Sequence, residues 1–205
     1  QTHYDSIISI HLPHELSGTY QSALNASNRV KAKINVLDGL SASVGLGLIV
    51  MEAARLAKTG KTHEEIVAVL PEIILQSNVY LVVKDLSCIV KGGRLPGWVK
   101  KVADFLHIRP VLSIKGNGNM GASGVIRGTS NLPEKISKLV LGKVDTNITY
   151  NISIGHCNTL KDGEKLMELI QKSHKKINSI YLMDIGCALG VHAGPGSLAA
   201  AIQPA

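Results

Sequence analysis

Two short segments near opposite ends of the chain combine polar side chains with glycine. Ser17, Gly18 and Thr19 stand where a strand predicted over residues 5–11 leads into a helix, and His192 precedes a Gly-Pro-Gly turn. Glycine lets a ligand approach the backbone, and the first turn of a helix has free N–H groups that attract anions. Hydroxyl, N–H and imidazole groups together predict a site for a carboxylate or a phosphate. Taken alone, the first segment is more typical of a helix cap, and the second is more typical of a histidine in a turn.

The elements that must position these groups follow from hydrophobic periodicity. Alternating apolar residues predict strands over residues 5–11 and 33–37. Apolar positions at helical spacing predict a helix after Ser17, capped by Ser17 or Thr19. A second helix over residues 44–58 is apolar nearly all round, which is typical of a buried helix. Strands alternating with helices predict a parallel α/β/α unit, and its thin sheet looks truncated.

Strands outnumber helices in the rest of the chain. A glycine-rich turn at residues 116–119 joins two alternating segments and predicts a hairpin. We therefore expect a mixed or antiparallel sheet with helices on one face. The predicted fold class is α/β with two domains, an incomplete N-terminal domain over residues 1–78 and a C-terminal domain over residues 79–205. The strands predicted for this second domain cover residues 80–84, 110–115, 120–127, 148–154, 180–183 and 198–202.

Composition narrows the partners of the chain. Its 205 residues carry a formal net charge of +7, which favours anionic partners, including peripheral contact with an anionic membrane. Aromatic residues make up only 3%, so there is no platform for stacking bases and we expect no nucleic acid partner. The three cysteines are far apart in the sequence and match no metal motif, which predicts free thiols in a reducing cytoplasm and no metal site.

Five segments resemble, in the same order, the motifs of the DegV family, which are bacterial two-domain fatty-acid-binding proteins. The first is Leu-Ser-Gly-Thr-Tyr-x-Ser-Ala, and the last is His-x-Gly-Pro-Gly-x-Leu. Between them lie an Asp-Gly-x-x-x-Ser-x-Gly-x-Gly-like segment, a Leu-x-x-x-x-x-Gly-Gly-Arg-like segment and a Leu-x-Ile-Arg-Pro-x-Leu segment. They occupy residues 16–23, 38–47, 86–94, 106–112 and 192–198.

The resemblance implies a carrier rather than an enzyme, with no cofactor besides its bound ligand. Family members hold one long-chain fatty acid between two domains, and some present its carboxylate to a separate fatty acid kinase, which makes an acyl phosphate for phospholipid synthesis. Carried over by position, Ser17 and His192 bind the carboxylate, and Arg94 and Arg127 face the kinase. Further ligand-binding positions implied by the matching segments are Gly18, Thr19, Ser43, Gly45 and Gly194.

Two other functions stay open. Ser17 and His192 with an acidic residue predict a serine hydrolase, although the Gly-x-Ser-x-Gly motif typical of many hydrolases is missing. An anion- or lipid-responsive regulatory protein is the second alternative. Family members also begin with a strand and a Thr-Ser segment that nothing here matches, so the chain resembles a member lacking about its first quarter.

Overall fold

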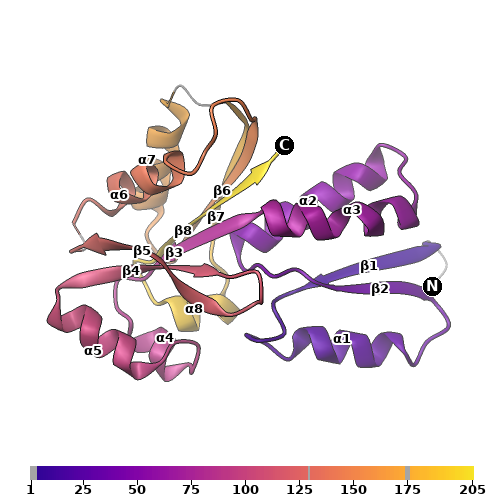
Figure 1. Ribbon diagram of the computed structural model, residues 1–205, viewed down its shortest axis with the longest axis horizontal. Helices are drawn as coiled ribbons and strands as arrows, with labels where there is room; N and C mark the ends of the chain where they lie inside the picture. Colours follow the sequence, from indigo (N-terminus) through magenta and orange to yellow (C-terminus); the bar gives the residue numbers. More distant parts are fainter. Residues whose placement is uncertain (1–3, 129, 174–175) are drawn as a thin grey trace.

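The computed structural model describes residues 4–128, 130–173 and 176–205, and their strands form two separate sheets (Figure 1). The smaller sheet pairs β1 (Ser6–His11) with β2 (Lys33–Asp38) in parallel. Helix α1 (Thr19–Ser27) lies on one face of it, and α2 (Val44–Lys58) and α3 (His63–Gln76) lie on the other. The predicted parallel α/β/α unit is confirmed.

Helix α2 has two apolar faces because it lies between the two sheets. Ile49 packs with α3 against the small sheet, whereas Val44 and Leu48 pack against the larger one. This double contact explains why the sequence of α2 is apolar nearly all round. The chain passes from one sheet to the other at the junction of α3 and β3, and the domain boundary at residue 78 stays a prediction.

The larger sheet has six strands in the order β5-β4-β3-β8-β6-β7. All neighbouring pairs are antiparallel except β6 and β7, which are parallel, so the predicted mixed sheet is confirmed. The last strand of the chain, β8, lies in the middle of the sheet. The strands are β3 (Asn78–Val82), β4 (Ile108–Ile114), β5 (Met120–Arg127), β6 (Tyr150–His156), β7 (Ile177–Asp184) and β8 (Leu198–Pro204).

The expectation that helices cover one face of this sheet is wrong, because they cover both. Leu198, Ala200 and Ile202 of β8 face α6 (Leu132–Leu141) and α7 (Leu160–Gln171). Ala199 and Ala201 face α2 on the opposite side. A central strand that is apolar on both faces needs cover on both. The helices α4 (Ser87–Lys91), α5 (Gly97–Phe105) and α8 (Cys187–Ala193) complete the cover on the α2 side.

The cap predicted for the helix after Ser17 does not form. Helix α1 begins at Thr19, its N-cap position is Gly18, and no side chain caps it. Ser43 does occupy the N-cap position of α2, but its side chain makes no capping hydrogen bond. In the described part of the chain, no helix has the length and apolar character needed to cross a bilayer.

Candidate functional site

A cavity of about 250 Å³ lies between the loops of the small unit and the α2 face of the six-stranded sheet. Its walls are almost wholly aliphatic. Alanine at position 199 of the central strand leaves room that a larger side chain would fill. The wall residues include Val79, Leu81, Leu112, Ile114, Leu189 and Ala199.

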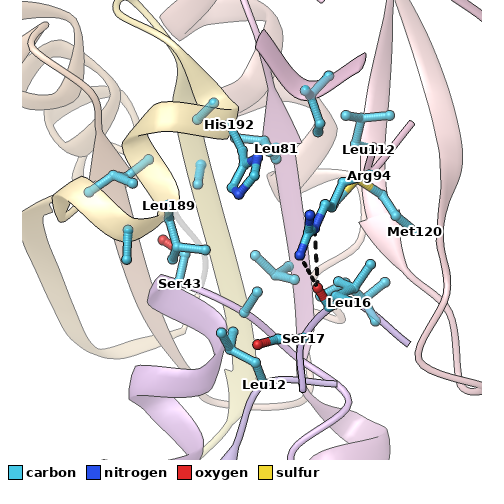
Figure 2. Close-up of a pocket in the computed structure, with 18 of the residues that line it drawn as sticks. Leu12, Leu16, Ser17, Ser43, Leu81, Arg94, Leu112, Met120, Leu189 and His192 are labelled. Atoms are coloured by element: carbon cyan, nitrogen blue, oxygen red, sulfur yellow. Dashed lines mark hydrogen bonds between the residues drawn. The ribbon is translucent and has the colours of Figure 1, made fainter. Parts of the chain in front are cut away.

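Six polar side chains interrupt this aliphatic lining, namely Ser17, Thr19, Ser43, Arg94, Ser113 and His192. Ser17 and His192 come from different units and lie on opposite sides of the cavity (Figure 2). The structure therefore places two side chains that are 175 positions apart in the sequence around one cavity. A ligand with an apolar body and one polar end suits this lining.

Ser17 is held by local backbone geometry at the end of the β1–α1 loop. Its backbone N–H donates to the carbonyl oxygen of Pro13 at 3.0 Å. Its hydroxyl oxygen accepts from the Thr19 N–H at 3.3 Å, a turn rather than a helix cap. Because the oxygen accepts this bond, the hydroxyl proton can be donated to a ligand.

His192 lies in the last turn of α8, a helix that the sequence did not predict. Its ring packs against the backbone of Gly92, where a Cβ atom would lie only 2.1 Å from Nδ1. Nδ1 is buried and has no hydrogen-bond partner among the described residues. A triad histidine needs a carboxylate on this nitrogen, so the arrangement gives the hydrolase hypothesis no support. Gly92 therefore helps to form the site, although the sequence indicates it only as part of the Gly-Gly-Arg segment.

Arg94 ties the two units together beside the cavity. Its Nε and Nη2 atoms donate to the carbonyl oxygen of Leu16 at 3.2 and 3.1 Å, and Nη1 donates to the Gly92 carbonyl at 2.7 Å (Figure 2). The residue is exposed as a whole and also lines the cavity. The guanidinium therefore contacts the residue before Ser17 and also Gly92, against which the His192 ring packs.

Arg127 lies elsewhere, on the edge strand β5. It borders a separate open groove with Lys135, Lys138 and Lys143. Its carbonyl oxygen accepts a hydrogen bond from Lys135 Nζ. Arg127 does not line the cavity that Arg94 lines.

Three of the glycines predicted to bind ligand do not line the cavity, namely Gly18, Gly45 and Gly194. Gly45 instead lets α2 approach β3, because a Cβ atom there would lie 2.9 Å from Val79 Cβ and 2.4 Å from Ser41 Oγ. Gly194 follows α8 with a φ of +75°, a conformation that favours glycine. These glycines shape the backbone around the site.

The three cysteines, Cys88, Cys157 and Cys187, are free thiols, as predicted. Burial raises the pKa of the Cys157 thiol and disfavours its reactive thiolate form. Within the described ranges, no group of three histidine, cysteine or acidic side chains is placed to hold a metal ion.

The fold and the cavity define a two-sheet α/β protein with an aliphatic cavity beside a polar cluster. A model of the family described as "Uncharacterised protein, DegV family" matches residues 1–205. The chain belongs to the DegV family.

Relatives in sequence support this membership. A DegV domain-containing protein of Clostridium acetobutylicum is 31% identical over 199 residues, which cover 95% of this chain and 69% of that protein. Another from Clostridium perfringens is 29% identical and covers 98% of this chain and 71% of that protein. The chain thus spans about seven-tenths of the length of these relatives.

Solved structures share the fold. A fatty-acid-binding DegV family protein of Thermus thermophilus is 25% identical with a TM-score of 0.89, over 99% of this chain and 72% of that one. A Thermotoga maritima protein, whose structure reveals a fatty acid binding function, is 25% identical with a TM-score of 0.84, over 98% and 70%. The fatty acid kinase B3 protein of Streptococcus pneumoniae, loaded with linoleic acid, is 23% identical with a TM-score of 0.86, over 100% and 73%, and shows likeness of fold alone.

Proposed function

We propose that this protein binds one long-chain fatty acid, with the acyl chain against the aliphatic walls and the carboxylate between Ser17 and His192. The observation that carries the proposal is the cavity itself, which combines aliphatic walls with hydrogen-bonding groups from both units. Fatty acid binding by the Thermus and Thermotoga relatives supports it.

The two parts of such a ligand contribute differently to binding. Each methylene moved from water into an apolar wall stabilises the complex by about 0.8 kcal/mol. A hydrogen bond to a charged carboxylate contributes about 1.5–3 kcal/mol. Ten buried methylenes therefore outweigh two head-group bonds, so the tail sets affinity while Ser17 and His192 set orientation.

The proposal extends to a separate kinase that receives the carboxylate and forms the acyl phosphate. In this reading the present chain supplies the substrate and is not itself the enzyme. Arg94 is the partner-facing residue beside the cavity, since it is exposed and adjoins the Ser17 loop. Arg127 and the three lysines of its groove offer a cationic surface to an acidic partner.

Peripheral contact with an anionic membrane is a further part of the proposal. The only Trp and the only Phe of the chain, Trp98 and Phe105, are 67% and 83% exposed on α5. Val102 and the adjacent Leu106 are exposed beside them. Aromatic and aliphatic side chains on a helix that also carries exposed Lys101 are typical of interfacial binding.

The binding test uses delipidated protein and three ligands of similar tail length: oleate, methyl oleate and oleyl alcohol. Oleate should bind tightly at one per chain, while the two ligands without a carboxylate should bind more weakly. Equal affinity for all three would remove the carboxylate site from the proposal. No binding of any of them, or turnover of methyl oleate, would move the assignment to a regulatory protein or to a hydrolase, respectively.

A further inference from the structure

We propose that Asp38 and His14 are positioning residues that hold the two head-group loops of the cavity, and that His14 makes this hold depend on pH. The inference rests on the proposed fatty acid binding, because its consequence is a change in ligand retention. The loops are the β1–α1 loop, residues 12–17, and the β2–α2 loop, residues 39–43. They carry Ser17 and Ser43 into the lining.

Asp38 is the last residue of β2 and its carboxylate contacts both loops. Oδ2 accepts from the backbone N–H of His14 at 3.1 Å and lies 2.5 Å from His14 Nδ1. Oδ1 accepts from the backbone N–H of Leu40 at 2.9 Å. One carboxylate, whose side chain is only 17% exposed, therefore links the ends of the two loops.

Both loops need such a restraint because neither is part of a helix or strand. Leu40 and Ser43 have φ values of +43° and +53°, which are uncommon for residues other than glycine. The hydrogen bond from the Leu40 N–H to the Asp38 carboxylate, two residues earlier, is the type that stabilises such a turn. On the other loop, Leu12 and Leu16 line the cavity on either side of His14. Movement of His14 would therefore move a wall of the cavity.

The groups around His14 come from three elements and its own loop. Asp38 lies on β2, Glu15 is the neighbouring residue with Oε1 3.1 Å from His14 Nε2, and the Tyr20 ring of α1 is 6.4 Å away between centroids. The β4–β5 turn, which carries Lys115, approaches the loop where a Cβ at Gly118 would lie 3.4 Å from Pro13 Cβ. Two carboxylates thus face the imidazole directly.

The direction of the pH effect follows from these partners. The hydrogen bond to Asp38 raises the pKa of His14 above its ordinary value of 6.5. Burial raises the pKa of Asp38, but hydrogen bonds from His14 and Leu40 outweigh it, and the pKa falls below 3.8. Between the lowered pKa of Asp38 and the raised pKa of His14, both side chains are therefore charged. Its ionic part is fully present below pH 6.5 and is lost as pH rises through the raised pKa of His14.

The experiment measures the dissociation rate of cis-parinaric acid from the full chain between pH 5.5 and 8.5. The variant is His14→Asn, which keeps a donor near the position of Nδ1 but does not titrate. The control is His63→Gln, which removes a histidine that contacts Asn35 away from the cavity. The ligand and the lining of the cavity are common to all three proteins, so their difference isolates His14.

From pH 5.5 to pH 8.5, the dissociation rate should rise in the unaltered protein and in His63→Gln. This rise should be about two- to fivefold larger than the rise in His14→Asn, which is the scale expected for the loss of an exposed ion pair. An unchanged pH dependence in His14→Asn would overturn the proposal. Hydrogen exchange of the amides in residues 12–17 and 39–43, compared between variant and unaltered protein at each pH, gives a readout without ligand. If the protein binds no ligand but its hydrogen exchange depends on His14, the proposed function is rejected and the positioning role is kept. If the variant and the unaltered protein exchange identically, the positioning role is rejected.

Discussion

The aliphatic walls of the cavity and its polar loops are built in opposite ways. The walls come largely from regular strands and helices of the six-stranded unit, where Ile154, Leu198 and Ala200 beneath them are fully buried. The opposite side, which carries Ser17, Thr19 and Ser43, comes from the segments after the two small strands, and the helix α1 there has no buried residue. The densely packed wall from the six-stranded sheet thus faces the less buried segments of the small unit across the cavity. The difference indicates that ligand affinity depends on the sheet, and ligand orientation and exchange depend on the loops.

The largest effect should come from comparing the packing of the two sheets. Ile154→Ala leaves a cavity in the core of the six-stranded sheet and should lower the free energy of unfolding by about 2–5 kcal/mol. Ile8→Ala removes a half-buried side chain from the small sheet and should cost about 1–2 kcal/mol, since less contact is lost. Urea denaturation of both variants checks this. An equal or larger loss for Ile8→Ala would contradict the contrast between the sheets.

Filling the cavity from its wall should affect ligand binding next most strongly. Ala188 of α8 lines the cavity and is exposed, so Ala188→Trp places an indole in the space without disturbing the core. Displacing about four methylenes of the ligand should weaken oleate binding about a hundredfold. Val191→Trp is the matched control, because Val191 is 67% exposed on the same helix and does not line the cavity. Similar affinities for the two variants would mean that the tail lies elsewhere.

Removing single polar groups should have a smaller effect. Ser17→Ala or His192→Ala removes one hydrogen bond to a carboxylate and should weaken oleate binding about tenfold. Binding of oleyl alcohol should change much less, which separates a head-group role from a general loss of fold. Ser22→Ala, on the exposed face of α1 and outside the lining, serves as the control. If oleate binds equally well to all three variants, the carboxylate does not lie between Ser17 and His192.

The smallest effect should follow from loosening the link between the units. Arg94→Gln loses the paired donation to the Leu16 carbonyl, so the β1–α1 loop should exchange its amide hydrogens a few times faster. The stability of the whole chain should change by less than about 1 kcal/mol, since Arg94 is exposed. Hydrogen exchange followed by mass spectrometry measures the amide exchange rate of each loop. Unaltered exchange in residues 12–17 would show that Arg94 does not restrain the loop.

Regular elements could be predicted from the sequence where hydrophobic periodicity was strong. The capping box of Thr62 and Glu65 forms at the start of α3 as its sequence pattern predicts. The hairpin of β4 and β5 also forms around its glycine-rich turn. Helix α8 was missed because its seven residues are too short for a 3.6-residue period to stand out. The cover on both sheet faces was missed because alternating apolar runs do not reveal which neighbours bury the second face.

The candidate site was predictable only in part. Ser17, Thr19, Ser43, Arg94 and His192 all line the cavity, and the motifs they belong to pointed to them. The wall residues carried no signal, since a leucine or an alanine of a tunnel looks like any core residue. The link from Asp38 to His14 was equally hidden, because it joins residues 24 positions apart through loop geometry.

The most direct test of the account is native mass spectrometry of the freshly purified protein, followed by denaturation and lipid extraction. The account predicts a bound species at one per chain whose mass, once extracted, is that of a long-chain fatty acid. The Ala188→Trp variant, prepared in parallel, should carry less of this species than the unaltered protein. A ligand-free chain that also fails to take up added oleate would contradict the central claim that the cavity is a fatty acid site.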